Sequence, residues 1–236
     1  MSESEVSLPR TKRWFPKVRD DIAYMLPMGA FVGLTFLGGY LPESAFPFVY
    51  AAKTIVAAVL LWMLWPAFTR IKWDYFWTGV LVGVVGLFQW VGTEELLLKY
   101  WPSYPRMSGD PFDPTAAFTS PWSFWLFVIV RWAGPTLVVP IMEELFWRDF
   151  LWRSLIAPND FKLAKIGEWD KSAFFVVAIM FATVHMQMWA TSVVWALMIG
   201  GLLVATRSIG ACIVAHGVTN FLLGAYVLVT EDWKYW

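Results

Sequence analysis

The amino-acid sequence predicts an all-α fold, a polytopic membrane protein with about seven to eight transmembrane helices. Of the 236 residues, 58% are hydrophobic and only 15% are charged, whereas soluble domains have about 25% charged residues. The mean hydropathy is +0.55, and the apolar residues fall into stretches close to the ~20 residues that a membrane-crossing helix needs. These observations exclude an ordinary soluble domain and place the apolar surface against lipid.

The charge balance and the cysteine count exclude further classes of protein. The 18 basic residues equal the 18 acidic residues, so no basic field is present that would attract nucleic acid. Cys212 is the only cysteine, which excludes an intrachain disulfide framework and a zinc site built from cysteines alone. We therefore expect a lipid bilayer around the protein and no nucleic-acid partner.

The first element is a polar N-terminal segment, residues 1–23, which we expect in the cytoplasm. An apolar stretch at 24–41 follows it. A cleaved signal peptide typically has a shorter basic region and ends at a small-residue cleavage site, whereas Leu41, Pro42 and Glu43 stand at this point. The stretch is therefore predicted to remain in the protein as the first membrane span.

Six further apolar stretches follow, at 46–68, 74–97, 122–156, 172–190, 193–206 and 210–229. The fourth of the seven spans is too long for one straight crossing, because its 35 residues rise ~52 Å and the bilayer core is ~30 Å thick. Gly134, Pro135 and Pro140 are the expected break points, since proline removes a helix donor. The sixth span has 14 residues and is expected to be a partial or displaced helix.

The basic residues predict the orientation, because cytoplasmic flanks of membrane proteins carry an excess of Lys and Arg. With the N-terminus inside, 12 of the 18 basic residues lie on inner flanks, three on outer flanks and three inside spans. We therefore expect a multi-pass protein of the cytoplasmic (inner) membrane with a cytoplasmic N-terminus. The spans form a single transmembrane domain, 24–229, which a short C-terminal tail, 230–236, follows.

A few ionisable and polar side chains lie inside the predicted spans. A charged group at the bilayer centre costs a few kcal/mol or more, so such a residue suggests a function. Glu143 and His185 each lie 13 residues from a predicted cytoplasmic end, which is ~20 Å at the helical rise. We expect polar groups from three helices to line one cavity that opens to the cytoplasm. The full set is Glu143, Glu144, Arg148, Asp149, His185, His216 and Asn220.

Three spaced motifs hold most of these residues. Glu143–Arg148 reads EExxxR, Phe181–His185 reads FxxxH, and His216–Asn220 reads HxxxN, in this order. Residues four apart share one face of a helix. Over roughly residues 122–229 the pattern resembles the CPBP family (CAAX protease and bacteriocin-processing, or Abi) of intramembrane proteases. Within that family it is most similar to the bacterial CAAX prenyl protease-related branch that is associated with exosortase systems.

The resemblance implies an intramembrane endopeptidase similar to the CAAX prenyl proteases, acting on a membrane-associated or lipidated peptide or protein. By this analogy Glu143 activates the attacking water, and His185 helps to hold that water. His216 and Asn220 would hydrogen-bond the oxyanion of the attacked carbonyl. Two supporting residues, Glu144 and Arg148, would hold the helix and balance the charge. This glutamate-dependent route needs no cofactor.

Alternatives to this interpretation stay open. Glu143, His185 and His216 also make up a three-ligand zinc set, although the sequence lacks an HExxH helix. Taken alone, Glu144 and Arg148 are typical of a structural ion pair. Two other functional classes compete with the protease. One is a non-proteolytic bacteriocin-immunity or scaffold protein, and the other is a small proton-coupled transporter whose buried Glu and His carry protons.

Two further residues have competing interpretations. Cys212 lies four residues before His216 and is a competing nucleophile, but a buried free cysteine commonly behaves as a small hydrophobe. Arg131 lies inside a predicted span. We expect its side chain to reach the interface or to pair with an acid such as Glu94 or Glu95.

Overall fold

The computed structural model describes residues 18–107 and 111–236, and helices are the regular elements of these ranges, without a β-strand. Residues 1–17 of the predicted N-terminal segment lie outside the described part. Short 3₁₀ turns lie at Glu43–Ala45, Trp65–Ala67, Phe161–Leu163, Met186–Met188 and Trp233–Tyr235. The α-helices are α1 (Asp20–Gly38), α2 (Phe46–Leu64), α3 (Phe76–Tyr100), α4 (Pro114–Ala117), α5 (Pro121–Ala133), α6 (Val139–Glu144), α7 (Trp152–Ile156), α8 (Lys171–Thr183), α9 (Trp189–Thr206) and α10 (Ile209–Thr230).

The all-α, multi-pass prediction is confirmed, and the number of spans is smaller than predicted. Six helical segments of the described chain are long and apolar enough to cross a membrane, and α8 is a shorter apolar helix of 13 residues. The six segments are Asp20–Gly38, Glu43–Ala67, Phe76–Tyr100, Pro121–Ile156, Met186–Thr206 and Ile209–Thr230. The short apolar helix is therefore the fifth of the predicted segments, whereas the sequence predicted that the sixth would be short.

This difference arises because the sequence places the boundary between the fifth and sixth spans at the wrong residues. The sequence places the division between the fifth and sixth spans at 190–193, but α8 ends at Thr183 and the chain turns through His185 before α9 begins. Apolar residues such as Met186 and Met188 continue across the turn, so hydropathy does not mark it. His185 thus lies at a turn between two helices and not inside a helix.

The long segment Pro121–Ile156 stays continuous where we predicted breaks. Two π-helical stretches, Gly134–Val138 and Leu145–Leu151, join α5, α6 and α7 into one helix. The first π stretch begins at Gly134, so the Gly-Pro pair widens the helix instead of ending it, as π-bulges do. Gly134 also fits closely against α2, because a Cβ atom there would lie 3.0 Å from Thr54 Oγ1.

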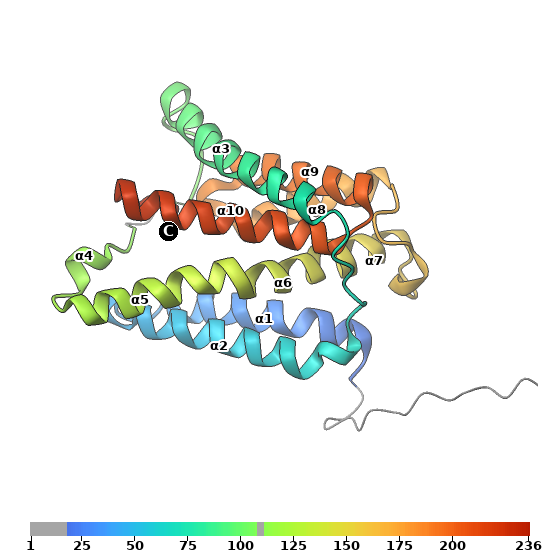
Figure 1. Cartoon of the computed structure of the whole chain (residues 1–236), viewed down its shortest axis with the longest axis horizontal. Coiled ribbons are helices and arrows are strands. Elements are labelled where there is room, and N and C mark those ends of the chain that lie inside the picture. The colour runs from blue at the N-terminus through green and yellow to red at the C-terminus, as the bar shows by residue number, and fades with distance from the viewer. Residues whose placement is uncertain (1–17, 108–110) are drawn as a thin grey trace, which may run out of the picture.

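The long helix runs through the middle of the bundle, with α1 and α2 on one side and α3, α8, α9 and α10 on the other (Figure 1). The most extensive helix pairs are α3 with α10, α1 with α2, and α8 with α9. Glycines let α3 approach α10, since a Cβ atom at Gly83 would lie only 2.7 Å from the Ala215 carbonyl oxygen. Small residues at a helix crossing are typical of membrane helix packing.

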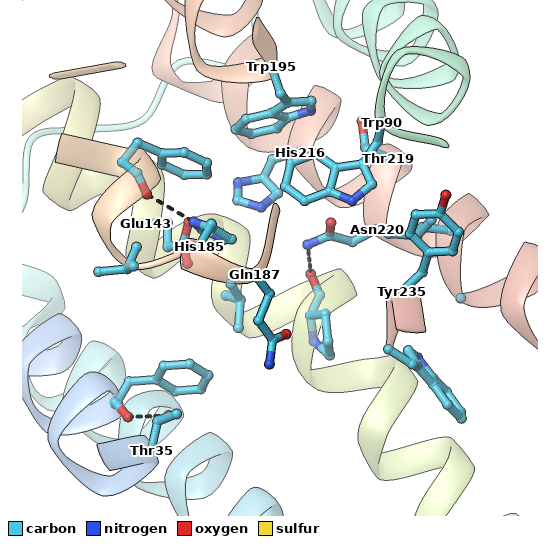
Figure 2. Close-up of a pocket in the computed structure, with 18 of the residues that line it drawn as sticks. Thr35, Trp90, Glu143, His185, Gln187, Trp195, His216, Thr219, Asn220 and Tyr235 are labelled. Carbon is cyan, nitrogen blue, oxygen red and sulfur yellow. Dashed lines mark hydrogen bonds between the residues drawn. The ribbon is translucent and has the colours of Figure 1, made fainter. Parts of the chain in front are cut away.

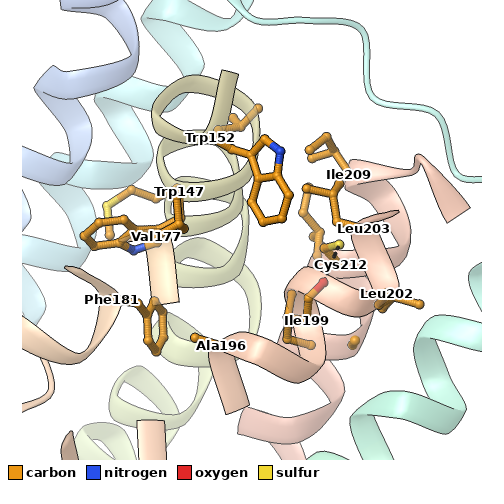
Figure 3. Close-up of a cluster of buried hydrophobic side chains, with 14 of the residues drawn as sticks. Trp147, Trp152, Val177, Phe181, Ala196, Ile199, Leu202, Leu203, Ile209 and Cys212 are labelled. Carbon is orange, nitrogen blue, oxygen red and sulfur yellow. Dashed lines mark hydrogen bonds between the residues drawn. The ribbon is translucent and has the colours of Figure 1, made fainter. Parts of the chain in front are cut away.

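The main hydrophobic core fills one end of the bundle (Figure 3). We call this the α7 end, because it is formed by α7, the connection 157–170 and the starts of α1, α8 and α10. Trp152, Ile199 and Leu203 are each at most 1% exposed there. The opposite end, formed by the starts of α2 and α5 and the ends of α1, α3 and α10, is the α5 end. The predicted tail folds back at the α5 end, where Trp233 and Tyr235 are buried.

Candidate active site

A cavity of about 460 Å³ lies between α1, α2, α6, α10 and the turn after α8. Four residues of the predicted motifs line it: Glu143 from α6, His185 from the turn, and His216 and Asn220 from α10. Figure 2 shows these side chains around the same space. The fold thus brings together polar groups from three separate motifs.

Glu143 is a buried carboxylate that faces this cavity. The residue is 5% exposed, and its Oε2 atom is buried with no hydrogen-bond partner among the described residues. A buried polar atom left without a partner costs about 1–3 kcal/mol, and a charged one costs more. Its neighbours Met142 and Leu145 are fully packed into the core, so the helix holds Glu143 at the cavity wall. A water or a substrate N–H in the cavity would supply the missing donor.

His185 presents one free ring nitrogen. Its Nδ1 atom lies 3.0 Å from the Phe181 carbonyl oxygen. A carbonyl oxygen only accepts, so Nδ1 must carry the proton, and in the neutral ring Nε2 then keeps its lone pair. The ring stacks on Phe181 with centroids 4.3 Å apart and contacts the edge of Trp90 at 6.0 Å. Two aromatic side chains therefore fix the orientation of the imidazole.

His216 is oriented in the same way, but by a charged partner. Its Nδ1 atom lies 2.8 Å from Glu144 Oε1, and the ring packs edge-on against Trp195 at 4.6 Å. The carboxylate accepts the Nδ1 proton, so Nε2 of His216 is the atom left for the cavity. Glu144 is fully buried behind the site and has no exposed surface.

The predicted pair of Glu144 and Arg148 is present in the structure. Arg148 Nε lies 3.3 Å from Glu144 Oε2, and both side chains are almost completely buried. The Arg148 guanidinium also lies 5.0 Å from the Phe181 ring centroid and 5.5 Å from that of Trp195. Arg148 thus neutralises the carboxylate that holds His216 and packs on the aromatic rings that hold both histidines.

Asn220 has a structural partner that the sequence did not reveal. Its Nδ2 atom donates to the Pro135 carbonyl oxygen at 2.8 Å. In a π-helical stretch that carbonyl would accept from the residue five positions on, which is Pro140 and has no N–H. Asn220 replaces the missing donor. One N–H of its side-chain amide is therefore committed, and the second remains for the cavity.

The zinc alternative needs three ligands close together, and the cysteine alternative needs Cys212 beside a base. In residues 18–107 and 111–236, no three His, Cys, Asp or Glu side chains lie close enough together to hold a metal ion. Glu143, His185 and His216 therefore do not form a ready three-ligand set. Cys212 is fully buried, and its thiol contacts the Ile199 carbonyl oxygen at 3.8 Å, while His216 bonds Glu144.

Asp149 belongs to a network outside the cavity. Its carboxylate accepts from the Tyr24 hydroxyl at 2.8 Å and pairs with Arg153. Arg153 in turn donates to the Ala164 carbonyl oxygen at 2.9 Å. This network ties α7 to α1 and to the connection 157–170, so Asp149 has a structural role at the α7 end.

The expected pairing of Arg131 with Glu94 or Glu95 is wrong, because both acids have other partners. Glu94 is fully buried and accepts from Tyr104, from Thr191 at 2.8 Å and from Arg106 at 2.9 Å. Burial, with the bond to this carboxylate, raises the pKa of Tyr104 to about 12. Glu95 pairs with Lys234 at 2.7 Å and accepts from Tyr235. Arg131 instead donates to the Tyr50 hydroxyl at 3.1 Å.

The cavity extends in the opposite direction from the one we predicted. From Glu143 its lining continues to Thr35, Lys53, Arg131 and Trp236, and all four lie in the half of the bundle at the α5 end. The α7 end is closed by the core of tryptophans and aliphatic side chains. Most of the basic flanking residues are at the α7 end, so a cytoplasmic opening and a cytoplasmic N-terminus do not both fit this geometry.

The sequence does not identify several residues that line the cavity. Trp90 contacts His185, and Gln187 lies exposed at the cavity wall. Neither carries a signal in the sequence, because tryptophans are abundant in this chain and Gln187 follows an apolar run. Lys53 did carry a signal, since it is a basic residue inside a predicted span.

A family model described as "Type II CAAX prenyl endopeptidase Rce1-like" matches residues 121–222 of the chain. The matched segment contains all six polar residues of the three motifs, Glu143, Glu144, Arg148, His185, His216 and Asn220. No significant match to the chain was found among curated proteins or among solved structures. The family match confirms the resemblance to CAAX proteases and does not address the exosortase-associated branch. Residues 121–222 of this multi-pass membrane protein are thus similar to the Rce1-like type II CAAX prenyl endopeptidases.

Proposed function

We propose that the protein is an intramembrane endopeptidase that hydrolyses a peptide bond of a membrane-associated or lipidated substrate, using water activated by Glu143 and His185. The observation that carries this proposal is the arrangement of Glu143 Oε2. This atom is buried and has no hydrogen-bond partner among the described residues, and the residue Glu143 lines the cavity. Peptide hydrolysis requires such an acceptor for the proton of the attacking water.

In the proposed reaction, a water molecule lies between Glu143 and the Nε2 lone pair of His185. Glu143 removes one proton as the water oxygen attacks the substrate carbonyl carbon. The C–N bond then breaks, and the proton held by Glu143 passes to the leaving amine. The carboxylate is thereby regenerated, and the products are a carboxylic acid and an amine.

The oxyanion needs a donor, and His216 is suited to this role only in its protonated form. Its Nδ1 proton is already held by Glu144, so Nε2 can donate only when it too carries a proton. A carboxylate hydrogen-bonded to the far side of an imidazole stabilises the imidazolium. The second N–H of Asn220 is a further donor to the same oxygen. No step in this proposal involves a metal ion.

The proposed location is the cytoplasmic membrane, with the N-terminus in the cytoplasm. The basic residues at the α7 end favour this orientation. The cavity would then open on the outer side of the membrane, and the substrate would approach from that side or from within the bilayer. The immunity or scaffold alternative and the transporter alternative gain no support from the family match.

The test is cleavage of a peptide panel by the purified protein in lipid nanodiscs. We expect the Glu143→Gln variant, which keeps the shape and removes the base, to lower kcat by about 10²–10⁴-fold. Glu43→Gln is the matched control, since Glu43 is exposed in a turn outside the cavity. Unchanged cleavage by Glu143→Gln would refute the mechanism. A chelator arm tests the metal version, because loss of activity on chelation would replace the proposal.

A further inference from the structure

His185 lies in a turn between two helices. α8 ends at Thr183 and α9 begins at Trp189, so the regular helical hydrogen bonds stop on both sides of the turn. Within the turn, His185 N donates to the Ala182 carbonyl oxygen at 3.0 Å, and Met188 N donates to the His185 carbonyl oxygen at 2.9 Å. The position of the imidazole therefore also depends on contacts that hold the turn from outside.

The loop after α3, residues 101–107, holds this turn at two points. Met107 N donates to the Met186 carbonyl oxygen at 3.2 Å, and the Trp189 ring Nε1 donates to the Pro105 carbonyl oxygen. The first bond reaches the residue directly after the histidine, and the second reaches the first residue of α9. A displacement of the loop would thus displace the turn that carries the histidine.

Glu94 of α3 links this loop to α9. Its side chain is fully buried, and its two oxygens bond different elements. Oε1 accepts from Tyr104 and, at 2.9 Å, from Arg106, both in the loop. Oε2 accepts from the Thr191 hydroxyl, in the first turn of α9, at 2.8 Å. One carboxylate thus holds both the loop that packs on the His185 turn and the helix that follows this turn.

The same face of α3 also contacts the imidazole. Trp90 lies four residues before Glu94, so the two side chains share one face of the helix. The centroid of the Trp90 ring lies 6.0 Å from that of the His185 ring. Trp90 lines the cavity, whereas Glu94 is not among the described residues that line it. α3 therefore supports the histidine both at its ring and at its turn, and Glu94 does so without contacting the cavity.

The proposed reaction depends on how precisely the two catalytic groups are placed. Glu143 lies in the continuous central helix between buried neighbours, whereas His185 lies on the turn. Both groups must reach one water molecule, and a misplacement of about 1 Å in such an arrangement can lower a rate by about 10²-fold. The position of the turn is therefore a point at which α3 can control the rate.

We infer that Glu94 is a positioning residue for His185, which it holds through the loop 101–107 and through α9. This inference rests on the proposed peptidase activity. Hydrogen bonds to an ionised acceptor are about twice as strong as neutral ones, so the charge of Glu94 strengthens both links. An amide has one acceptor atom in place of two. Glu94→Gln therefore keeps the shape of the side chain but can accept from only one of the two sides.

The first test measures kcat and KM of Glu94→Gln in two backgrounds, the wild type and His185→Ala, with the peptide panel in nanodiscs. In the wild type, kcat should fall about 10- to 100-fold and KM should change by less than about twofold. In His185→Ala, Glu94→Gln should lower kcat no further, because the group that it positions is gone. Glu43→Gln, exposed in a turn, is the matched control. An unchanged kcat in the wild type, or an equal fall in both backgrounds, would overturn the inference.

Two milder variants make the same test if Glu94→Gln does not fold. Tyr104→Phe removes one bond on the loop side, and Thr191→Val removes the bond to α9, while the carboxylate keeps its ion pair. Each should lower kcat by about threefold to tenfold, and only where His185 is present. Tyr100→Phe, exposed at the end of α3, is the control. If both variants behaved like this control, the links would not position the histidine.

The second test does not depend on cleavage. The sequence contains two histidines, so NMR of nitrogen-15-labelled histidine in the substrate-free protein reports on His185 and His216, and His216→Gln assigns the signals. Glu94→Gln should shift or split the ring signals of His185 and leave those of His216 unchanged, even if the peptidase proposal fails. Unchanged His185 signals would refute the positioning role. A change in the signals of both histidines, with a lower unfolding temperature, would show a general structural role and would also refute it.

Discussion

The two histidines of the site differ in the oxygen that holds Nδ1. His185 donates to a neutral carbonyl, whereas His216 donates to the carboxylate of Glu144. A carboxylate stabilises a protonated imidazole far more than a carbonyl does, because the imidazolium is then paired with a negative charge. On the proposed mechanism His185 thus acts as an acceptor towards water and His216 as a donor towards the oxyanion.

This difference predicts the effect of Glu144→Gln. The amide can still accept from His216 Nδ1 but no longer stabilises the imidazolium, so kcat should fall by about 100-fold with little change in KM. The variant should also unfold more easily, by about 3 kcal/mol, because the buried Arg148 loses the carboxylate with which it pairs. The measurements are kcat, KM and thermal unfolding in detergent.

A second substitution separates the two effects of Glu144→Gln. In Glu144→Gln with Arg148→Met the unpaired buried charge is gone, so the unfolding temperature should recover. The value of kcat should stay low, because His216 still lacks its carboxylate. If kcat recovered together with stability, Glu144 would serve only to balance Arg148, and the donor role of His216 would be wrong.

At the scale of the helix, the π-helical stretch Gly134–Val138 depends on a side chain of another helix. Asn220 of α10 donates to the Pro135 carbonyl oxygen that Pro140 cannot serve. Asn220→Ala should therefore leave a poorly satisfied carbonyl and cost about 1–3 kcal/mol. For a chain of this length the unfolding temperature should fall by about 2–10 °C. Asn159→Ala, exposed in the connection 157–170, is the control, and equal unfolding temperatures for the two variants would contradict this explanation.

The contact of α3 with α10 gives a second prediction for a helix. A Cβ atom at Gly83 would lie 2.7 Å from the Ala215 carbonyl oxygen, whereas nothing lies within 4 Å of a Cβ at Gly92. Gly83→Ala should push α10 away and move His216, the residue after Ala215, so both stability and kcat should fall. Gly92→Ala in the same helix should gain up to about 1 kcal/mol from helix propensity. Thermal unfolding and kcat of the two variants check this, and equal behaviour would refute the close approach.

The sequence predicts the helices better than it predicts how they begin and end. Apolar stretches of about 20 residues are local features, so six of the seven predicted spans correspond to long helices. The turn at His185 is invisible to hydropathy, because Met186 and Met188 keep the segment apolar. The π stretch at Gly134 needs a donor from α10, which no local pattern contains. Both features depend on contacts between helices.

In the candidate site, the polar residues could likewise be predicted from the sequence, but their partners could not. Scarce polar residues in apolar spans identify Glu143, His185, His216 and Asn220, and the fold places all four at one cavity. The partner of each group could not be predicted, because it comes from a distant part of the chain. Arg131 is the clearest example, since the acids expected to pair with it are held by the loop after α3 and by the C-terminal turn.

At the scale of the whole molecule, the cavity and the basic flanks lie at opposite ends of the bundle. In the ranges 18–107 and 111–236, eight of the 14 Lys and Arg residues lie at the α7 end, in the connection 157–170 and at the adjoining helix ends, and the core closes this end. The cavity continues to the α5 end instead. With the proposed cytoplasmic N-terminus, the opening would lie on the outer side of the membrane, where an exported substrate would reach it.

Cysteine labelling tests this orientation, because the native Cys212 is fully buried and should not react. In intact cells a membrane-impermeant maleimide should label Gln187→Cys, at the exposed cavity wall. It should label Asn159→Cys, exposed at the α7 end, only after the membrane is permeabilised. The reverse pattern would mean that the cavity faces the cytoplasm and that the N-terminus lies outside. Labelling of both sites in intact cells would mean that the reagent passes through the protein, and neither orientation would then explain the position of the basic residues.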